Sequence, residues 1–414
     1  MHVTHVMVGF SGQLLTDLDR LLPANSVMVI EEPEISAIRD VPALLAGHPC
    51  VASFVTAPTQ AEGAPERLVE AIERPAQVSS VLPSTEYGVV GASALAQAWG
   101  LPGAGLAAAT VLRDKARLRT VAAGAGIPQP DWILADGPED LSAFRQRHGG
   151  RCVLKPTTLQ ASIGVQRLSE SADSAQAWAI SAGADEVERR ARYAAGGRIL
   201  VEQWLTGSEV SVECLVHEGQ VGFFNVTAKT VQDGRFPVEM AHVAPAPLSP
   251  ELADRLRMSV EELIGATQFR TGVLHSEWII EAGVPHLVEC AGRLPGDYID
   301  QLLDFAYGGS LVARLLEVLA GGKTEAPAAE QGAAIRFLGA SPGRVSAVTG
   351  VDQAREQPGV LRVAMTVDVG DVIAPITDSN KRCGYVIARG ADGAAAAVLA
   401  DEVARGIQIQ VDGT

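Results

Sequence analysis

The segment 275–297 constrains the fold most strongly, because it has the pattern of two short strands around a tight turn. If the chain folds back at Gly283, Glu277 falls opposite Glu289. Opposed side chains of an antiparallel pair share a face, with Cβ atoms roughly 5 Å apart, and like charges there are unfavourable. We therefore expect a positive group between the two carboxylates.

Two carboxylates on a rigid hairpin suit Mg²⁺, a hard ion that takes oxygen ligands and usually shares them with phosphates. Arg293 follows four residues after Glu289, at a strand exit that also contains Gly292 and Pro295. An arginine there could hold an anion beside the metal. The alternative is a solvated hairpin edge that carries two unrelated glutamates, and the segment alone leaves both interpretations open.

Composition narrows the class of protein. A chain of 414 residues is long enough for two to four domains of roughly 100–200 residues each. With 47% apolar and 20% charged residues, and no long polar stretch, a folded core is expected. The formal net charge of −16 argues against nucleic acid or an anionic membrane surface as a general partner, since both need basic patches.

The sequence has no pattern typical of secretion, membrane insertion or disulfide bonding. Residues 1–12 lack a positive region followed by a long apolar run, and no window approaches about 18 uninterrupted apolar residues. The five cysteines are scattered and form no C-x-x-C pair, so neither a zinc cluster nor a disulfide framework is indicated. We expect a protein of the reducing cytoplasm.

Short apolar segments alternate with helical ones at the start of the chain, which predicts a parallel sheet with helices on its faces. The expected strands lie at 3–10, 27–30, 51–55 and 78–82. This unit is Rossmann-like, but it contains no G-x-G-x-x-G motif, and the partial match at Gly103 lacks a preceding strand. A dinucleotide site is therefore not expected.

Lys155 ends an expected strand and precedes a loop of mostly small residues, T-T-L-Q-A-S-I-G at 157–164. A lysine beside free backbone N–H groups is suited to bind phosphate; the alternative is a solvated surface lysine. A helix is expected at 171–195, followed by a strand at 198–202 and a hairpin of 209–216 with 220–229.

The C-terminal part, from residue 333, is strand-rich with one helix, which predicts a small β-rich module. It holds no cluster of catalytic residue types, so we interpret it as a packing or cover element. The sequence G-G-K-T at 321–324 lacks the first glycine and the preceding strand of a Walker A loop, so no P-loop is expected.

The order of these features resembles the ATP-grasp superfamily of carboxylate–amine ligases over about 107–307. In this sequence the features are, in order, Lys115, Lys155, the E-Q-W-L segment at 202–205, Glu209 and the hairpin carboxylates. Within the superfamily the chain is most similar to the L-amino-acid ligase branch, which forms dipeptides. The features that carry this closer resemblance are T-A-K at 227–229, V-E-M-A-H-V-A-P-A at 238–246, and the strand-rich C-terminal module with its late G-Y-V-I-A strand.

The resemblance implies an ATP-grasp fold that combines α/β and α+β units. It implies an N-terminal Rossmann-like domain (1–105), an ATP-grasp domain (106–322) and a small β-rich C-terminal domain (333–414). Within 106–322, two α+β subdomains would bind ATP: a nucleotide-binding lid at about 131–205 and a metal-binding, catalytic part at about 206–322.

The resemblance also assigns residues to the nucleotide. Lys115 and Lys155 would contact the ATP phosphates, and the loop that closes over them would contain Ser162 and Gly164. The remaining nucleotide contacts would come from Glu202 and Leu205, at a hinge that reads adenine through backbone groups, and from Glu209, which would bind the ribose hydroxyls.

Glu277 and Glu289 would hold Mg²⁺, with Mn²⁺ as a substitute, and Arg293 would stabilise the acyl phosphate and the tetrahedral intermediate. The amino-acid pocket would lie near Glu239 and His242, although a structural role is an alternative for the histidine. One departure from the family concerns the E-x-N motif of many members, whose asparagine is a third metal ligand. Here that position is Ala291, so a second ion would depend on the two glutamates, phosphate oxygens and water.

The implied activity is an ATP-dependent ligation of a carboxylate with an amine through an acyl phosphate, with ADP and phosphate released. One alternative is an ATP-grasp carboxylase or nucleotide-pathway ligase that activates bicarbonate or formate. Another is a non-catalytic ATP-binding protein, for which Ala291 is the only support. The expected partners are small-molecule acid and amine substrates, without nucleic acid or membrane, and a homodimer is compatible with the resemblance. Which acid and which amine are joined does not follow from the sequence.

Overall fold

The computed structural model describes residues 2–194, 197–325 and 327–412. Its N-terminal part is a parallel sheet in the order β3-β2-β1-β4, with β1 His5–Val8, β2 Val27–Glu31, β3 Val51–Thr56 and β4 Ser80–Pro83. Five helices accompany these strands: α1 Gly12–Leu21, α2 Pro33–Arg39, α3 Val41–Leu45, α4 Ala64–Ala71 and α5 Val89–Ala98. Helices cover the sheet, so its central strands are buried apolar runs rather than alternating ones. The expected Rossmann-like unit is confirmed.

Two helices, α6 Leu106–Leu112 and α7 Lys115–Ala125, lead into a small antiparallel sheet, called here the small sheet. Its order is β5-β8-β6-β7, with β5 Trp132–Ala135, β6 Cys152–Pro156, β7 Gln166–Leu168 and β8 Ile199–Glu202. Helices α8 Pro138–Arg147 and α9 Ser174–Ala182 pack against it. The helix expected at 171–195 is thus shorter than predicted: it ends before Gly183, and residue 195 lies outside the described residues.

The largest sheet, called here the central sheet, has eight strands in the order β13-β12-β9-β10-β11-β14-β18-β16. Its first five strands are β9 Ser208–His217, β10 Gln220–Val231, β11 Glu239–Ala244, β12 Gly272–Glu281 and β13 Val284–Ala291. Side chains alternate between its faces. Along β9, Val210, Val212 and Cys214 pack under α10 Pro250–Thr267. The residues between them point to the opposite face, so the charged side chains of β9 all face the same side.

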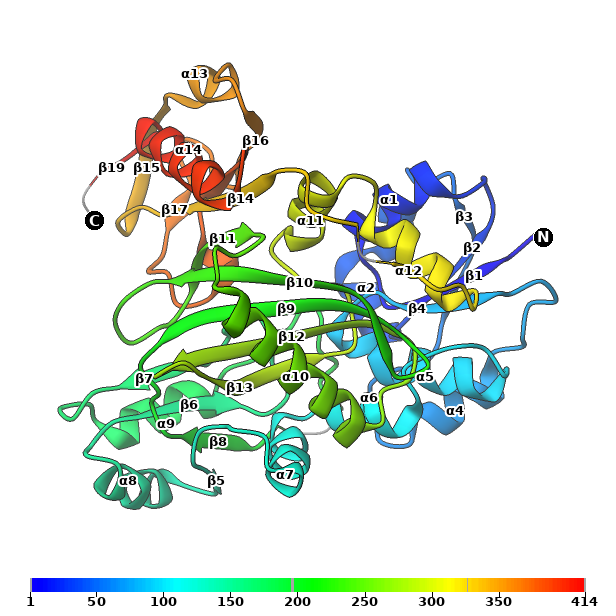
Figure 1. The fold of residues 1–414 in the computed structure, drawn as a ribbon, viewed down its shortest axis with the longest axis horizontal. Helices are drawn as coiled ribbons and strands as arrows, with labels where there is room; N and C mark the ends of the chain where they lie inside the picture. The colour runs from blue at the N-terminus through cyan, green and yellow to red at the C-terminus, as the bar shows by residue number, and fades with distance from the viewer. Residues whose placement is uncertain (1, 195–196, 326, 413–414) are drawn as a thin grey trace.

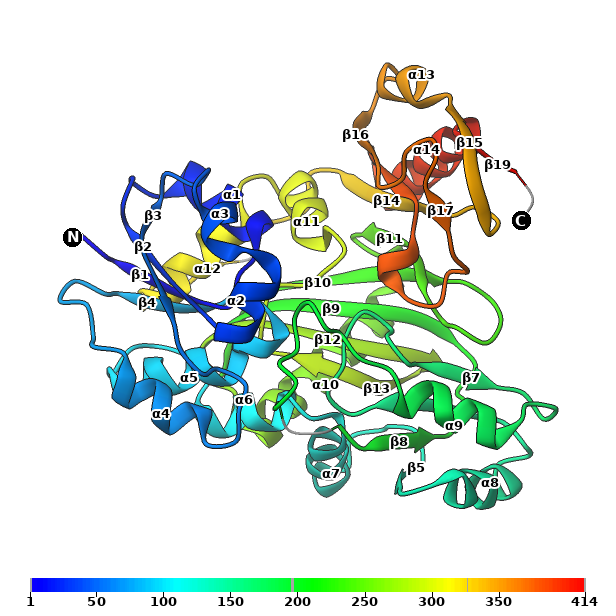
Figure 2. The ribbon, with the colours of Figure 1, turned by 180° about the vertical axis from the view of Figure 1, so that it is seen from behind.

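The C-terminal strands extend the central sheet instead of forming a separate layer. β14 Gly332–Leu338 pairs with β11, and β18 Gly384–Gly390 and β16 Val360–Met365 follow. A second sheet, β17-β15-β19, consists of β15 Gly343–Thr349, β17 Val372–Ile373 and β19 Gln408–Asp412, and the helices of this region are α13 Val351–Arg355 and α14 Gly393–Gly406. Figures 1 and 2 show this region at the end of the central sheet, away from the small sheet.

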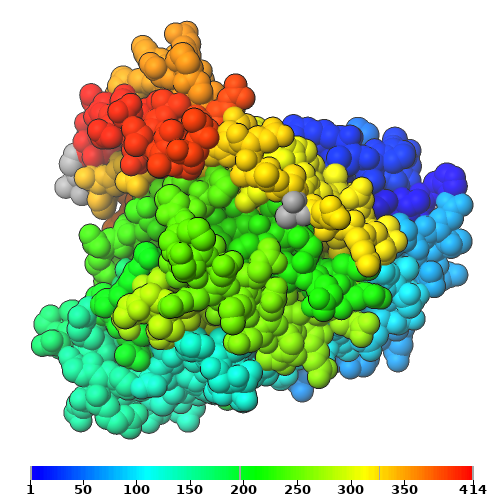
Figure 3. Space-filling view, in the orientation of Figure 1, coloured from blue at the N-terminus to red at the C-terminus, as the bar shows by residue number. Residues whose placement is uncertain are grey.

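Helices α11 Ile299–Tyr307 and α12 Leu311–Leu319 lie between the N-terminal strands and the C-terminal region. Their apolar faces pack on the central sheet and on α1, which joins the three parts of the chain into one body (Figure 3). Among the described residues, none of the helices combines the length and the apolar character that crossing a membrane requires.

The hairpin of β12 and β13 turns at Ala282 and Gly283, which both have positive φ angles of +49° and +78°. A two-residue turn of this kind sets a register in which Trp278 faces Leu287. A register shift next to Trp278 then brings Glu277 directly opposite Glu289. The predicted pairing of the two glutamates is confirmed, and the bulge is the feature that produces it.

Candidate active site

A cavity of about 470 Å³ lies where the small sheet, the central sheet and the carboxyl ends of the N-terminal strands meet, a volume within the usual range for ligand sites. Of the twelve site residues predicted from the sequence, eleven line it: Lys115, Lys155, Ser162, Glu202, Leu205, Glu209, Glu239, His242, Glu277, Glu289 and Arg293. Gly164 is not among the lining residues. Its φ of +74° and its packing against Pro156 and Ala184 leave no room for a side chain, and its part in closing the loop stays a prediction.

The paired hairpin glutamates each have an ammonium partner. Lys229 Nζ donates to Glu277 Oε1 at 2.7 Å and to Glu239 Oε1 at 3.2 Å, and Lys115 Nζ lies 2.8 Å from Glu289 Oε1. Burial alone would raise the pKa of Glu277, but Lys229 and His275 hold it well below its usual range. The expected positive charge is present, but it comes from two separate lysines, one on each carboxylate, and not from a single group between them.

This arrangement fits a divalent cation. The two carboxylates face one another across the hairpin, line the cavity and already stabilise positive charge there. Among the described residues, no group of three or more His, Cys, Asp or Glu side chains is arranged to hold a metal ion. Such a site would supply two carboxylates and leave the other positions to phosphate oxygens and water, as is usual for Mg²⁺.

Lys155 belongs to a buried charge triad at the edge of the small sheet. Its Nζ lies 2.5 Å from Glu202 Oε2, and Arg119 Nε donates to Glu202 Oε1 at 2.6 Å. Burial would raise the pKa of Glu202, but the two cations lower it. The Glu202 side chain is thus bound by Lys155 and Arg119, so only the backbone of residue 202 is left for the predicted hinge contact with adenine. Sequence reasoning missed Arg119, because nothing marks it within an ordinary helix.

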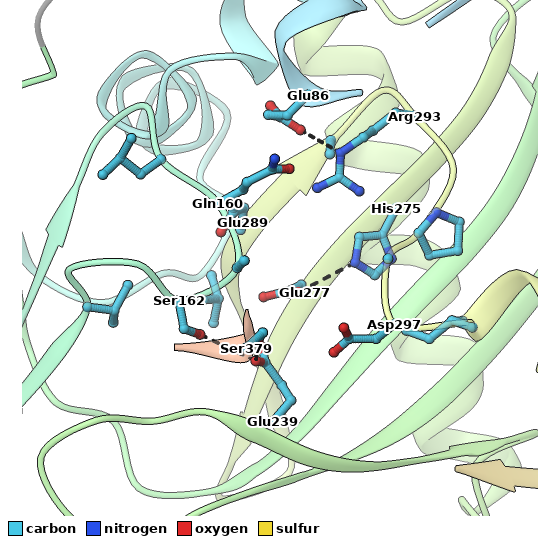
Figure 4. Close-up of a pocket in the computed structure, with 18 of the residues that line it drawn as sticks. Glu86, Gln160, Ser162, Glu239, His275, Glu277, Glu289, Arg293, Asp297 and Ser379 are labelled. Atoms are coloured by element: carbon cyan, nitrogen blue, oxygen red, sulfur yellow. Dashed lines mark hydrogen bonds and ion pairs between the residues drawn. The ribbon is translucent and has the colours of Figure 1, made fainter. Parts of the chain in front are cut away.

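The loop after β6 contacts both the central sheet and the C-terminal region (Figure 4). Ser162 Oγ donates to Glu239 Oε2 at 3.3 Å, and Ser379 Oγ donates to the same oxygen at 3.4 Å. Ser379 N also donates to Ala161 O at 3.1 Å. Ala161 and Ser162 have φ angles of +55° and +58°, in a region that non-glycine residues rarely occupy.

The C-terminal region is therefore more than a packing or cover element, and that interpretation is wrong. Arg382, which lines the cavity together with Ser379 and Asn380, donates two hydrogen bonds to Asp297, at 2.6 and 2.8 Å. His242 Nε2 lies 3.1 Å from the same carboxylate, and these partners lower the pKa of Asp297 despite its burial. This contact could not be predicted from local sequence patterns, because its members are far apart in the chain.

His275 is a second feature that sequence reasoning missed. Its Nδ1 lies 3.1 Å from Glu213 Oε1 and its Nε2 lies 3.4 Å from Glu277 Oε1 (Figure 4). Glu213 is fully buried and also accepts hydrogen bonds, from Ser211, Thr227 and Asn225. The alternation of side chains along β9 could have indicated this cluster, because residues 209, 211 and 213 place polar side chains on one face of the strand.

Arg293 links the hairpin exit to the N-terminal part of the chain. Its Nε donates to Glu86 Oε2 at 2.8 Å, just beyond β4. Burial would raise the pKa of Glu86, but Arg293 and its cationic neighbours lower it. Carboxyl ends of parallel strands are a frequent location for ligand sites in α/β proteins, and Ser84 and Thr85 line the cavity there as well.

Two family models match the chain. Residues 149–300 match the ATP-grasp domain, so the fold is the ATP-grasp fold. Residues 336–412 match L-amino acid ligase C-terminal domain 2. The chain thus contains a region that matches the ATP-grasp domain and a region that matches the L-amino acid ligase C-terminal domain 2, as the resemblance implied. Enzymes of the ATP-grasp family use ATP and a divalent metal ion.

Individual relatives agree with this assignment. The L-amino acid ligase from Bacillus licheniformis superposes with a TM-score of 0.79 at 17% identity, and the match covers 99% of each chain. Alanine–anticapsin ligase of Bacillus subtilis is 23% identical over 284 residues, which is 62% of this chain and 58% of that protein. D-alanine–D-alanine ligase of Methylococcus capsulatus is 35% identical over 107 residues, 26% of this chain and 31% of that protein. The chain thus matches less than two thirds of the length of these two curated relatives, and the structural likeness at 17% identity concerns the fold.

Proposed function

We propose that this protein is an ATP-dependent ligase that joins the carboxylate of one amino-acid-like substrate to the amine of another. ADP and phosphate would be the other products. The observation that carries the proposal is the convergence of two opposed carboxylates and three cations, Lys115, Lys229 and Arg293, on one cavity of an ATP-grasp fold.

ATP would lie between the small sheet and the central sheet. Lys155, Lys115 and the backbone around Ser162 would bind its phosphates, with Glu209 at the ribose and the backbone near Leu205 at the adenine. Glu277 and Glu289 would hold Mg²⁺, or Mn²⁺ in its place. The ion would offset the negative charge on the phosphate groups. The location of all these residues on one cavity supports this arrangement.

The reaction would proceed in two displacements. A substrate carboxylate oxygen bonds to the γ-phosphorus while the bond to the β,γ-bridging oxygen breaks, which gives an acyl phosphate and ADP. The amine of the second substrate then bonds to the acyl carbon, the carbon–oxygen bond to phosphate breaks, and the amine loses its proton. Arg293 would stabilise the oxyanion of that second step, since its guanidinium is held in place by Glu86.

The protein contributes mostly positioning and charge neutralisation, which suffice for phosphoryl transfer. The amino-acid pocket would include Glu239, His242 and Asp297, with Arg382 from the C-terminal region. The cytoplasmic location and the homodimer expected from the sequence are part of this proposal, as is the absence of a nucleic-acid or membrane partner.

The direct test measures phosphate release from ATP and Mg²⁺ against a matrix of paired amino acids, with mass spectrometry of each active mixture. ADP, phosphate and a product of mass equal to the two acids minus water would support the proposal. AMP and pyrophosphate would contradict the acyl-phosphate route. ADP release driven by bicarbonate without amino acids would favour the carboxylase alternative, and tight ATP binding without turnover in any mixture would favour the non-catalytic one.

Variants test the site assignment. Glu289→Gln and Arg293→Ala should abolish product formation while circular dichroism and gel filtration remain as in the wild type. Glu281→Gln is the matched control, because Glu281 lies on the same hairpin but bonds to Thr206 outside the cavity. Normal turnover in either active-site variant would remove the assignment.

A further inference from the structure

The charges that line the cavity are almost all paired. Nine carboxylates line it, and eight of them have a basic side chain within ion-pair distance: Glu86, Glu186, Glu202, Glu209, Glu239, Glu277, Glu289 and Asp297. Asp300 is the ninth, and none of the ion pairs among the described residues includes it.

Asp300 lies in the first turn of α11 and is only 5% exposed. Its hydrogen bonds come from neutral groups: Gln13 Nε2 lies 3.1 and 2.9 Å from its two carboxylate oxygens, and Gln301 N donates at 2.9 Å. Burial raises the pKa of Asp300 to about 7, and the nearby carboxylates of Asp304 and Asp17 contribute to the shift. The carboxylate is therefore oriented by donors but not neutralised.

A buried carboxylate that faces a cavity without a cation lowers the stability of the folded protein. A ligand of opposite charge stabilises it strongly when the two groups form hydrogen bonds of good geometry. The partner would have to come from the cavity side, because in the described part of the chain α1 and α11 supply only neutral donors to Asp300, from Gln13 and from the backbone of Gln301. Gln13 and Asp300 both line the cavity, as do residues 293–297, which connect the reactive Arg293 end to α11.

We propose that Asp300 and Gln13 form a subsite for the ammonium group of the carboxyl-donating substrate. This inference rests on the proposed ligase function and names one recognition element of that site. The ammonium of the donor keeps its charge throughout the reaction, and it would stabilise Asp300 as a carboxylate. The nitrogen of the acceptor must become neutral before it attacks, and a carboxylate that stabilises its protonated form would oppose this step.

The test compares ligands that differ only in the ammonium group. Binding of each of the twenty L-amino acids and of its des-amino carboxylic acid is measured by calorimetry with Mg²⁺ and a non-hydrolysable ATP analogue, so no turnover is needed. The wild type should bind at least one amino acid more tightly than its des-amino analogue. Asp300→Asn should weaken that amino acid roughly 10–100-fold, the loss expected for a hydrogen bond to a charged group, and leave the analogue unchanged.

Asp304→Asn is the matched control. Asp304 lies one turn further along α11, its pKa is also raised by burial, to about 6, but it does not line the cavity. Its substitution should leave both affinities unchanged. Gln13→Lys is a second variant, which places an ammonium beside Asp300 within the protein and should exclude the amino acid while it spares the des-amino analogue.

Three results would overturn the subsite: wild-type affinity for the amino acid in Asp300→Asn, an equal loss for both ligands in that variant, or no preference for the ammonium in the wild type. These outcomes are separate from failure of the proposed function, which is measured as product formation. A wild type that binds amino acids through Asp300 but never forms product would refute the ligase and keep the subsite.

Discussion

Lys229 is a residue on which three carboxylates of the site converge. Its side chain is 3% exposed and contacts Glu277 and Glu239, and Glu209 lies near enough to act on it. Burial would lower the pKa of Lys229, but these three carboxylates raise it well above its usual value. The ammonium is thus charged at all physiological pH values and holds three acids in place.

Replacement of Lys229 by methionine should therefore both destabilise the protein and abolish activity. Removing one partner of a buried ion pair leaves uncompensated charge and typically costs about 3–5 kcal/mol. Urea unfolding of Lys229→Met and of the exposed control Lys323→Met measures the cost. Because a divalent ion can replace the lost positive charge between the carboxylates, millimolar Mg²⁺ should recover part of the stability of Lys229→Met. Equal stability of the two variants would contradict this account.

Removal of the Asp300 charge should stabilise the protein, whereas removal of the Lys229 charge should destabilise it. Its pKa is about 7 in the folded protein against the ordinary aspartate value of 3.8, so the folded state binds the proton more tightly than the unfolded chain. Stability from this group is fully present below about pH 4 and is lost as the pH rises through 7. Asp300→Asn should therefore be more stable than the wild type at pH 8, by roughly 2–4 kcal/mol, and no more stable at pH 4.

Urea unfolding of both proteins between pH 4 and pH 8 tests the Asp300 prediction. Lower stability of Asp300→Asn at pH 8 would mean that the acid serves the fold and not a ligand. Greater stability combined with weaker amino-acid binding would show that the protein tolerates an unpaired charge in order to bind its substrate.

At the scale of elements, alternation along the strands decides which side chains reach the site. This part could be predicted from the sequence, because a strand with a period of two places Glu209, Glu277 and Glu289 on fixed faces. The bulge beside Trp278 could not be, since a register shift depends on how β12 packs between β9 and β13. The partners of Glu202 and Asp297 were also beyond reach, because they come from distant helices and from the C-terminal loop.

Arg167 connects β7 of the small sheet to β9 of the central sheet and to the loop between β10 and β11. Its Nη2 donates to Glu209 Oε1 at 2.6 Å, and its backbone N donates to Arg235 O at 2.7 Å. Arg167→Met should free Glu209, the predicted ribose ligand, and loosen the small sheet. We expect faster amide hydrogen exchange in β6 and β7 without nucleotide, and a several-fold weaker affinity for ATP.

Arg151→Met is the control for the Arg167 variant, because Arg151 stacks on Trp204 at 4.1 Å but has no ion pair with the central sheet. Hydrogen exchange followed by mass spectrometry reads both variants. Unchanged exchange and unchanged ATP affinity in Arg167→Met would show that other contacts, such as that of Ser162 with Glu239, are sufficient to hold the small sheet.

At the scale of the whole molecule, the division into 1–105, 106–322 and 333–414 stays a proposal, and the central sheet qualifies it. The strand β14 pairs with β11 through residues 333–336, so one sheet runs through both of the later parts. Local patterns indicated the C-terminal strands, but residues 237–247 were interpreted as irregular, and the structure shows the strand β11 there. Pairing between segments about ninety residues apart has no signature in local periodicity. The central sheet therefore crosses the boundary that was proposed between residues 322 and 333.

Removal of residues 333–414 should consequently damage the ATP-grasp part itself. The cut exposes the edge of β11, strips Ile335, Phe337 and Tyr385 from the core beneath α11, and leaves Asp297 without Arg382. An exposed strand edge favours aggregation, and Asp297, which keeps only His242 as a partner among the described residues, loses the stabilisation that Arg382 supplies. We expect the fragment 1–332 to aggregate, or to melt well below the full chain and bind ATP weakly.

Co-expression of 333–414 as a separate chain should restore solubility and ATP binding, because the lost contacts are non-covalent. A fragment that is soluble, melts with the full chain and binds ATP equally well would show that the C-terminal region is an independent appendage, and Arg382 would then have no part in the site.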